Sequence, residues 1–344
     1  MNSAPLCSVI VVNWNGRALL GPCLEALRRQ TFHDFEIILV DNASSDGSPE
    51  WIATHYPEVC LVVNERNLGF AEGNNVGFAV ARGEFLVLLN NDTQADPGFL
   101  EALVETAHQN ESTGMVGGVL VFAHRPGIIA SAGIRMQRDG VATDHLAGRP
   151  LVVLPAGLAQ AFGPCGGAAL YRREMLEEVG FFRPEYFTYL EDADLAWRGR
   201  LAGWRCRITP RALARHVYSA SGVQGSPFKS FHLARNRVLL LFLNLPAGLW
   251  ARYAPLILAY DLAACAYGLL TRDREVLRGR LAALRMLAGM RPARRAAQRL
   301  RRVPLRELAR LLSPPLAPWA TLRLRREIGW LAEPPPEVRC IDSS

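Results

Sequence analysis

The feature that most constrains this chain is a regular alternation of short apolar runs and longer amphipathic stretches over its first 125 residues. The apolar runs are rich in β-branched residues, as strands are: Leu6 to Val12, Glu36 to Val40, Val59 to Val63 and Glu84 to Leu89. The stretches between them have helical character: Arg17 to Arg29, Ser48 to His55, Ala71 to Ala81 and Pro97 to His108. Strands that alternate with helices predict an α/β fold with a largely parallel central sheet.

Polar clusters follow three of the predicted strands. They are Asn13-Trp14-Asn15, Asp41-Asn42 and Asn90-Asn91-Asp92. Parallel strands bring their carboxyl ends to one edge of the sheet, where the ligands of such folds bind. The clusters therefore predict a ligand site there, and Asp92 is a candidate ligand for a hard cation. The same residues also suit turns and helix caps, so the pattern leaves both interpretations open.

The middle section, about 126 to 225, is less regular but contains two notable segments. One is Gly163-Pro164-Cys165-Gly166-Gly167, and the other is the acidic helix start Glu191-Asp192-Ala193-Asp194. In the predicted helix, Ala193, Ala196, Trp197 and Leu201 share one face and Gly203 is a plausible stop. Carboxylates at a helix start favour the helix dipole, so capping competes with a general-base role for each of them.

The composition changes after residue 229. The segments Val238 to Ala251 and Ala254 to Leu270 are apolar apart from Asn244 and Asp261, with a break at Pro246. Residues 271 to 310 then contain thirteen arginines and three acids. Few aromatics stand between the arginines, which argues against nucleic acid and favours an anionic membrane surface. The alternative is that these helices bury their apolar faces on the catalytic domain or in a homodimer interface.

A true membrane span needs ~20 apolar residues. The run from Ala254 to Leu270 supplies 17, with Asp261 near its middle, and a central Asp costs ~3 kcal/mol on insertion. We therefore expect peripheral or monotopic attachment at the cytoplasmic face of the membrane. The predicted domains are 1–228 (catalytic), 229–312 (apolar and then Arg-rich helices) and 313–344 (a Pro-containing tail).

The seven cysteines are scattered, odd in number and without a Cys-x-x-Cys pair. This pattern argues against a zinc site or a disulfide framework and favours a reducing compartment. The N-terminus lacks a basic segment followed by an apolar run, so no signal peptide is expected.

Two other nucleotide-binding classes fit the sequence poorly. A nicotinamide-dependent dehydrogenase would carry Gly-x-Gly-x-x-Gly after its first strand, where this chain has Asn13-Trp14-Asn15-Gly16. A nucleotidyltransferase would usually place a Gly-rich loop bearing Lys or Arg there, and this position has none.

Taken together, the order and spacing of the motifs resemble glycosyltransferase family 2. The resemblance covers roughly residues 6 to 245 and rests on five segments: Ser8 to Asn15, Val40 to Ser48, Asn67 to Ala71 with Asn74-Asn75, Leu88 to Asp92, and Tyr189 to Leu195. It is closest to the rhamnosyltransferase-like members that build bacterial surface polysaccharides. The motif set is specific for the family and weak for the sugar.

The resemblance implies a GT-A fold, a divalent metal (Mg²⁺ or Mn²⁺) and a donor site. Trp14 falls where an aromatic stacks on the nucleotide base, and Asp41 where a carboxylate recognises that base. Arg66 is a weaker candidate for the diphosphate. Asn91 and Asp92 fall on the Asp-x-Asp-like motif, with Asp92 as the metal-binding carboxylate. Because Asn91 replaces an acid, this site carries less charge than many members do.

The resemblance also implies the catalytic residues. Asp192 matches the catalytic base, with Glu191 beside it, and His216 lies 24 residues beyond Asp192 where relatives carry a metal-binding histidine. One base that acts opposite the leaving group gives inversion of the sugar. No second carboxylate has a clear nucleophile role, although the sequence leaves Asp194 open.

The implied function is transfer of a sugar from a nucleotide diphosphate donor to a lipid-linked saccharide in surface polysaccharide or cell-wall synthesis. The first expectation for the donor is dTDP-rhamnose, with UDP-galactose and UDP-glucose as alternatives. A different interpretation is a non-catalytic nucleotide-sugar-binding subunit of a membrane polysaccharide assembly complex. The presence of Asp92, Asp192 and His216 together argues against that interpretation.

Overall fold

The computed structural model describes residues 4–155, 157, 159–217 and 226–333. Its N-terminal half is built on four parallel strands in the order β3-β2-β1-β4. They are β1 (Cys7–Asn13), β2 (Phe35–Asp41), β3 (Cys60–Val63) and β4 (Phe85–Leu89). The register pairs Asn13 with Asp41, so the polar clusters that follow these strands meet at one edge. All four predicted strands are confirmed to within one residue at each end.

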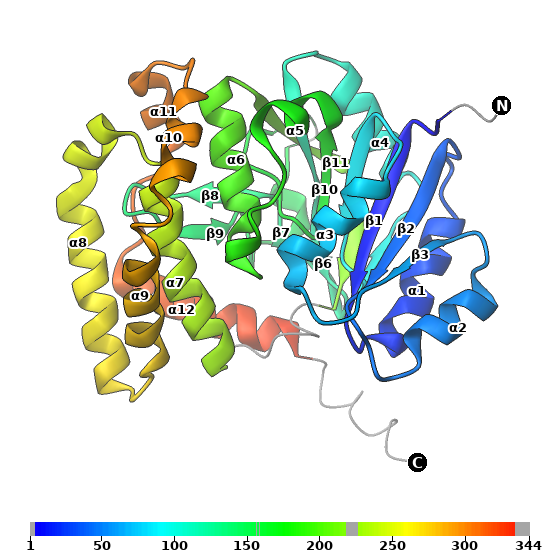
Figure 1. Ribbon diagram of the computed structural model, residues 1–344, viewed down its shortest axis with the longest axis horizontal. Helices are drawn as coiled ribbons and strands as arrows, with labels where there is room; N and C mark the ends of the chain where they lie inside the picture. The colour runs from blue at the N-terminus through cyan, green and yellow to red at the C-terminus, as the bar shows by residue number, and fades with distance from the viewer. Residues whose placement is uncertain (1–3, 156, 158, 218–225, 334–344) are drawn as a thin grey trace.

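Helices cover both faces of this half-sheet (Figure 1). They are α1 (Arg17–Arg28), α2 (Ser48–His55), α3 (Gly69–Val80) and α4 (Phe99–His108), close to the predicted ranges. Val9 and Val11 of β1 pack into the cluster that contains α1 and α4, while Ile10 packs into the opposite one. The approach of α3 is close, because a Cβ atom on Gly77 would lie 2.6 Å from Ile10 Cγ2.

The sheet becomes mixed beyond β4. Strand β10 (Ala168–Arg172) runs antiparallel between β4 and β6 (Thr113–Phe122). Strand β11 (Arg205–His216) is parallel to β6 and antiparallel to β5 (Thr93–Ala95), and β7 (Arg125–Ser131) pairs with β6. The predicted parallel arrangement thus holds for the first four strands. The short connection from Phe122 to Arg125 permits only antiparallel pairing of β6 with β7.

The remaining elements of this part are short. They are the hairpin of β8 (Ile134–Met136) and β9 (Ala142–Asp144), the 3₁₀ turns η1 (Leu151–Val153) and η2 (Pro184–Tyr186), and helices α5 (Arg173–Val179) and α6 (Glu191–Ala202). Helix α6 has the predicted apolar face and ends at Gly203, whose φ of 100° is left-handed. It is buried on nearly every side, which the sequence pattern does not indicate.

A buried carboxylate anchors the start of α6. Asp194 is fully buried and accepts hydrogen bonds from Arg198 Nε (2.9 Å), Tyr186 Oη (3.1 Å) and Asn244 Nδ2 (2.7 Å). Arg183 lies 3.3 Å away. Burial by itself would raise the pKa of Asp194, but the charges of Arg198 and Arg183 and these hydrogen bonds hold that pKa below its usual value. The carboxylate of Asp194 therefore has a structural role.

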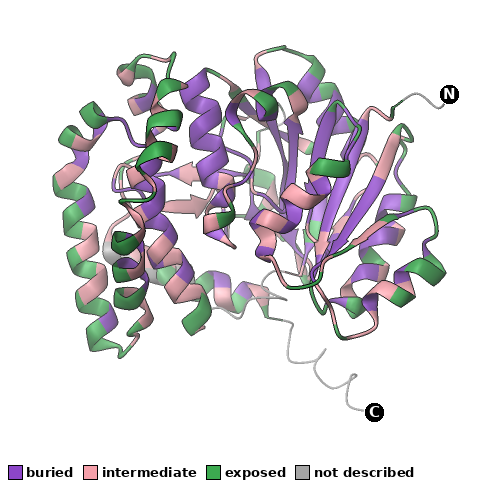
Figure 2. Ribbon diagram, viewed as in Figure 1, coloured by how far each residue is buried: buried purple, intermediate pink, exposed green. Residues whose placement is uncertain are grey.

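The C-terminal part is helical. It comprises α7 (Pro227–Asn244), α8 (Ala247–Leu270), α9 (Glu275–Met286), α10 (Arg291–Arg299), α11 (Leu305–Leu311) and α12 (Pro318–Ala332). Figure 2 shows α8 at the edge of the molecule with much of its length exposed. Asp261 of α8 accepts hydrogen bonds from Arg237 (2.7 Å) and Arg280 (2.9 Å), which tie α8 to α7 and α9.

Helix α8 is longer than the apolar run that predicts it. It begins at Ala247 and has 24 residues, so by length and composition it could cross a membrane. The helix is also largely uncovered by the rest of the protein, since only 17% of its most apolar 18-residue stretch is buried. Leu262, Leu269 and Leu270 are 73%, 65% and 84% exposed.

Helix α12 returns from the helical part to the sheet. Ile328 and Leu331 are buried in the same cluster as the α1–α4 face. Arg125 Nη1 of β7 donates to the carbonyl oxygens of Leu331 (2.6 Å) and Glu333 (2.8 Å), and its guanidinium lies 4.3 Å from the ring centre of Trp330. Residues 334–344, the rest of the predicted tail, lie outside the described residues.

We expect Asp194→Asn to lower the free energy of unfolding by about 3–5 kcal/mol, because it leaves the buried charge of Arg198 without its partner. Urea denaturation monitored by circular dichroism measures this. The loss is greatest at neutral pH and shrinks as pH falls below about 4, where protonation of Asp194 removes the same interaction in the parent protein. The matched control is Glu105→Gln, which removes an exposed pair with Arg211 and costs less than about 1 kcal/mol. An equal effect of both changes would contradict the anchoring role.

Candidate active site

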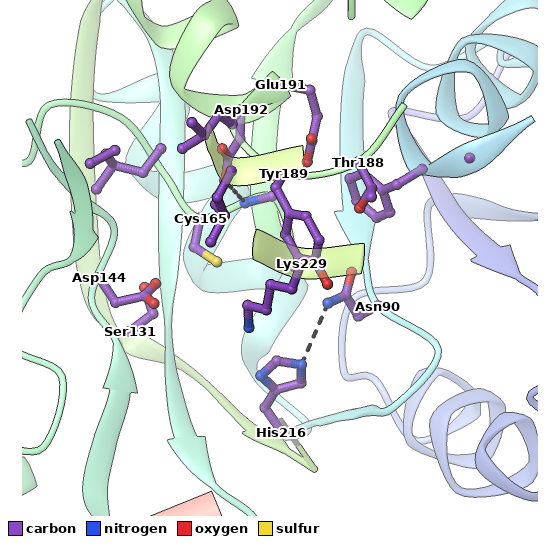
Figure 3. Close-up of a pocket in the computed structure, with 18 of the residues that line it drawn as sticks. Asn90, Ser131, Asp144, Cys165, Thr188, Tyr189, Glu191, Asp192, His216 and Lys229 are labelled. Carbon is purple, nitrogen blue, oxygen red and sulfur yellow. Dashed lines mark hydrogen bonds between the residues drawn. The ribbon is translucent and has the colours of Figure 1, made fainter. Parts of the chain in front are cut away.

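A cavity of about 480 Å³ opens at the carboxyl ends of β1 and β4 and extends to the β8–β9 hairpin and α12. Figure 3 shows part of its lining. Six of the residues singled out from the sequence line it: Trp14, Asn91, Asp92, Glu191, Asp192 and His216. Asp41 and Arg66 do not belong to the lining found among the described residues, and Arg66 is exposed on the loop after β3.

Trp14 stands at the rim of the cavity. It follows β1 directly and is 49% exposed, which is unusual for so large an aromatic side chain. An indole that is open to solvent at the edge of a cavity can stack on a flat ligand group.

A hydrogen-bonded chain connects the ends of β2, β1 and β4. Asn13 Nδ2 donates to Asp41 Oδ2 (2.9 Å), and Asn91 Nδ2 donates to Asn13 Oδ1 (2.8 Å). Ser44 donates to Asp41 through its backbone N (2.8 Å) and its hydroxyl (2.7 Å). Asp41 is fully buried, so these contacts hold the loops after β1 and β2 together. Its recognition of a base stays a prediction.

Asp92 and His216 come together although 124 residues separate them. The antiparallel pairing of β5 with β11 places them side by side, and Asp92 Oδ1 lies 3.0 Å from His216 Nε2. Both side chains are largely buried. Apart from this approach, Asp92 Oδ1 accepts no hydrogen bond from the residues that the structure describes.

This pair fits a divalent cation. Two adjacent ligands of an octahedral ion at ~2.1 Å lie ~3 Å apart, which is the observed separation of Asp92 Oδ1 and His216 Nε2. Among the described residues, no group of three or more His, Cys, Asp or Glu side chains could hold a metal alone. Any ion here would therefore need further ligands from water or from a bound substrate.

The loop before α6 has an unusual backbone. Phe187, Tyr189 and Leu190 have φ values of 61°, 69° and 68°, a region that residues other than glycine rarely adopt. Asn236 of α7 holds this loop, because its Nδ2 lies within 3.0 Å of the carbonyl oxygens of Tyr186, Thr188 and Tyr189. Such strained backbone persists only where the surroundings enforce it, and here it sets the direction in which α6 starts.

Asp192 is held in place by backbone groups. Gly166 N donates to its Oδ2 (3.0 Å) and Ala193 N donates to its Oδ1 (2.7 Å). Burial raises the pKa of Asp192, the two N–H donors lower it, and the charge of Asp144 raises it, with a net value of about 6. The carboxylate is thus ionised at neutral pH and still basic enough to accept a proton.

The carboxyl group of Glu191, next to Asp192, has a different pKa shift. Burial and the neighbouring charge of Asp192 raise the pKa of Glu191 well above its usual value. Within the described part of the chain, its Oε2 has no hydrogen-bond partner. Glu191 is therefore the weaker acid of the two adjacent carboxyl groups, and Asp192 loses its proton first as pH rises.

Several lining residues were not singled out from the sequence: Asn90, Ser131, Asp144, Lys229, Thr321, Leu324 and Ile328. Asn90 Nδ2 lies 3.4 Å from His216 Nε2, and the ammonium group of Lys229 lies 5.4 Å from the ring centre of Tyr189. Asn90 belongs to the polar cluster after β4, which is a signal that could have found it. The others carry no motif and meet only through the fold.

Comparisons with known proteins find related glycosyltransferase sequences. EpsH of Bacillus subtilis (strain 168), whose name describes a glycosyltransferase, is 35% identical over 106 residues, which are 30% of each chain. The N-acetylglucosaminyl-diphospho-decaprenol L-rhamnosyltransferase of Mycobacterium tuberculosis (strain ATCC 25618 / H37Rv) is 27% identical over 235 residues. That match covers 60% of this chain and 75% of the relative.

A solved structure supports the fold. The mannosyltransferase PcManGT from Pyrobaculum calidifontis, in complex with GDP-Man and Mn²⁺, superposes with a TM-score of 0.53 at 19% sequence identity. The match covers 96% of this chain and 86% of that chain. The predicted GT-A fold is confirmed. The family model for glycosyl transferase family 2 matches residues 8–180, which are 173 of the 344 residues. The protein therefore belongs to glycosyl transferase family 2, as its motifs indicated, and is a glycosyltransferase.

Proposed function

We propose that this protein is a metal-dependent, inverting glycosyltransferase that moves a sugar from a nucleoside diphosphate onto a saccharide acceptor. The observation that carries the proposal is that one cavity contains both a pair of side chains suited to a cation and a separate carboxylate suited to act as a base. A carboxylate–imidazole pair, Asp92 and His216, suits a cation, and a separate carboxylate, Asp192, is ionised at neutral pH by its N–H donors. Trp14 adds a stacking surface for a base.

Asp92 and His216 would hold a divalent ion together with oxygens of the diphosphate. A carboxylate and the phosphates of a substrate are the ligands that Mg²⁺ and Mn²⁺ usually take. When bound, the ion stabilises the negative charge that develops on the leaving diphosphate. Asn91 lines the same end of the cavity without adding charge, and its side chain is held by Asn13.

Asp192 is the proposed general base. A hydroxyl acceptor is a poor nucleophile until its proton is removed, and a base with a pKa near the working pH removes it most efficiently. The pKa of Glu191 is raised by burial, which favours its protonated form, and Asp194 is paired with Arg198 and Arg183, so neither is suited to be a second carboxylate for a covalent step. A single base that acts opposite the leaving group gives inversion.

The identities of the donor and the acceptor are inferred from resemblance to known relatives. One relative is named for the transfer of L-rhamnose to N-acetylglucosaminyl-diphospho-decaprenol, which supports dTDP-rhamnose as the donor and a lipid-linked saccharide as the acceptor here. UDP-galactose and UDP-glucose are the alternatives. A screen of the purified protein against a panel of nucleotide sugars decides among them, with release of the nucleoside diphosphate as the readout.

We further infer that the α8–α9 region lies on the cytoplasmic face of the membrane. Its exposed apolar side chains are Leu256, Leu258, Leu262, Tyr267, Leu269, Leu270, Leu277, Leu281 and Leu284. Exposed arginines stand among them at 272, 274, 278 and 285. Apolar burial together with basic charge is the combination that holds a helix in the interface of an anionic leaflet. The charge of Asp261 does not oppose this, since Arg237 and Arg280 neutralise it within the protein.

The first prediction concerns the metal. We expect Asp92→Ala to lower transfer at least ~100-fold, because the ion loses its carboxylate ligand and the leaving group loses its stabilisation. Donor affinity measured by calorimetry should fall in the presence of Mn²⁺ and change little in chelator. His216→Ala should lower activity less and raise the Mn²⁺ concentration needed for half-maximal rate. Metal titrations of both variants that match the parent would remove this pair from the metal site.

The second prediction concerns the base. Asp192→Asn keeps the shape of the side chain and removes the proton acceptor, so we expect turnover to fall by ~100-fold or more with donor affinity nearly unchanged. In the parent, kcat/KM should fall as pH drops below about 6, where Asp192 becomes protonated. The variant should lack this acid limb. Glu191→Gln is the matched control and should retain the limb. If Glu191→Gln were the crippling change, the assignment of the base would be wrong.

The third prediction concerns the membrane. The protein should float with liposomes that contain anionic lipid, and added salt should weaken the binding, because each arginine near the surface contributes ~1 kcal/mol. Replacing Leu262 and Leu269 together by serine should abolish flotation. Val152→Ser, at a site that is 89% exposed on η1, is the control and should leave it unchanged. Resistance to both salt and carbonate would instead indicate that α8 spans the bilayer, and binding to no liposome would favour a protein interface.

A further inference from the structure

The cavity has two ends with different chemistry. One end lies at the ends of β1, β2 and β4 and contains Trp14, Asn91 and Asp92. The other end is formed by β7, the β8–β9 hairpin and α12, whose lining residues fall between Ser131 and Ile328 in the sequence. Asp192 lies between them, since it lines the cavity and its pKa responds to the charge of Asp144 at the second end.

The second end has a polar wall. Asp144 is the last residue of β9, and Figure 3 shows its carboxylate beside Ser131, on the side of the cavity away from Asn90. The charge of Asp144 also raises the pKa of the buried Cys165 thiol, after the larger effect of burial. Asp144 therefore faces the same space as Asp192 and Cys165. A carboxylate in such a wall can accept hydrogen bonds from the hydroxyl groups of a sugar.

The second end also has an apolar wall. Leu120 and Ile134 contribute from the sheet side, and Leu324 and Ile328 from α12. The helix is fixed in this position by Arg125 and by the bond from Leu316 N to Gln137 Oε1 (2.6 Å). These contacts make α12 a permanent part of the cavity.

We propose that this end of the cavity is a two-part acceptor subsite for a saccharide that carries an apolar group. In the subsite, Asp144 holds a non-reacting hydroxyl of the acceptor sugar and α12 covers the apolar group with Leu324 and Ile328. The proposal rests on the proposed transferase function, which assigns the opposite end to the nucleotide and the cation. The reacting hydroxyl must then reach Asp192 from the α12 side.

The test uses the full-length protein and paired acceptors. Methyl glycosides of common sugars are screened with the active donor, and the best one is compared with its octyl glycoside below the micelle-forming concentration. The parent should show a lower KM for the octyl compound. Leu324→Ala should remove most of this difference, raising the octyl KM about 5–10-fold through lost apolar contact while leaving the methyl KM unchanged. Leu331→Ala is the matched control, because Leu331 lies on the same helix and does not belong to the described lining of the cavity.

Asp144→Asn tests the polar wall. It should raise the KM for both glycosides about 10-fold or more, the usual effect of losing a hydrogen bond to a charged group. Asp139→Asn, in the turn of the same hairpin, is its control. The donor KM should be unchanged in every variant, since the nucleotide end is untouched. Thermal unfolding measured for each variant confirms that it is folded.

Different results would reject the acceptor subsite and the proposed transferase function. Equal losses for methyl and octyl glycosides in Leu324→Ala, equal effects of Leu324→Ala and Leu331→Ala, or a raised donor KM in Asp144→Asn would overturn the subsite. If the parent hydrolysed no nucleotide sugar, the transferase proposal would fail instead. Calorimetric binding of the octyl glycoside to the parent and to Leu324→Ala would then still decide whether α12 binds an apolar group, and equal affinities would reject it.

Discussion

The buried carboxylate of Asp194 is the contact on which the geometry of the site depends. It receives Arg198 from its own helix, Arg183 and Tyr186 from the segment before that helix, and Asn244 from α7. A buried carboxylate needs its charged and hydrogen-bonding partners in place, because removing an arginine weakens its compensation and removing a neutral donor leaves an oxygen unsatisfied. The start of α6, and with it Asp192, is thereby tied to the segment before the helix and to α7 of the helical C-terminal part.

This arrangement explains why two neighbouring acids behave so differently. Asp192 gains two backbone N–H donors because α6 begins against the Gly166-Gly167 turn. Glu191 also lines the cavity, but its Oε2 gains no donor from the described residues. Position along the first turn of the helix, rather than the type of side chain, decides which acid is ionised. Local partners also stabilise the carboxylate of Asp261, because its ion pairs with Arg237 and Arg280 compensate its charge in an otherwise apolar helix.

The sequence predicted the parts of the molecule that local periodicity controls. The first four strands and helices agree with the predicted ranges to within one or two residues. The family resemblance assigned Asp92 and His216 to one metal site, and the fold brings them to 3.0 Å from each other, while their binding of a metal stays a prediction. Hydrogen-bond partners from distant elements were not predictable in this way. Asn236 supports three carbonyl groups of a loop about 50 residues earlier, and nothing in its own neighbourhood indicates this. Asp144 and α12 likewise enter the cavity only because β7 and the last helix pack together.

The position of α12 also fixes an order of events during synthesis. The wall that it forms is made after the strands, after α6 and after the apolar α8, because it follows them in the chain. Ribosomes release a chain from its N-terminus, and the domains fold in that order. The nucleotide end of the cavity can therefore form on the nascent chain, while the opposite end stays open until α8 has left the ribosome. Completion of the cavity is thus delayed until α8, with its exposed leucines, has already been synthesised.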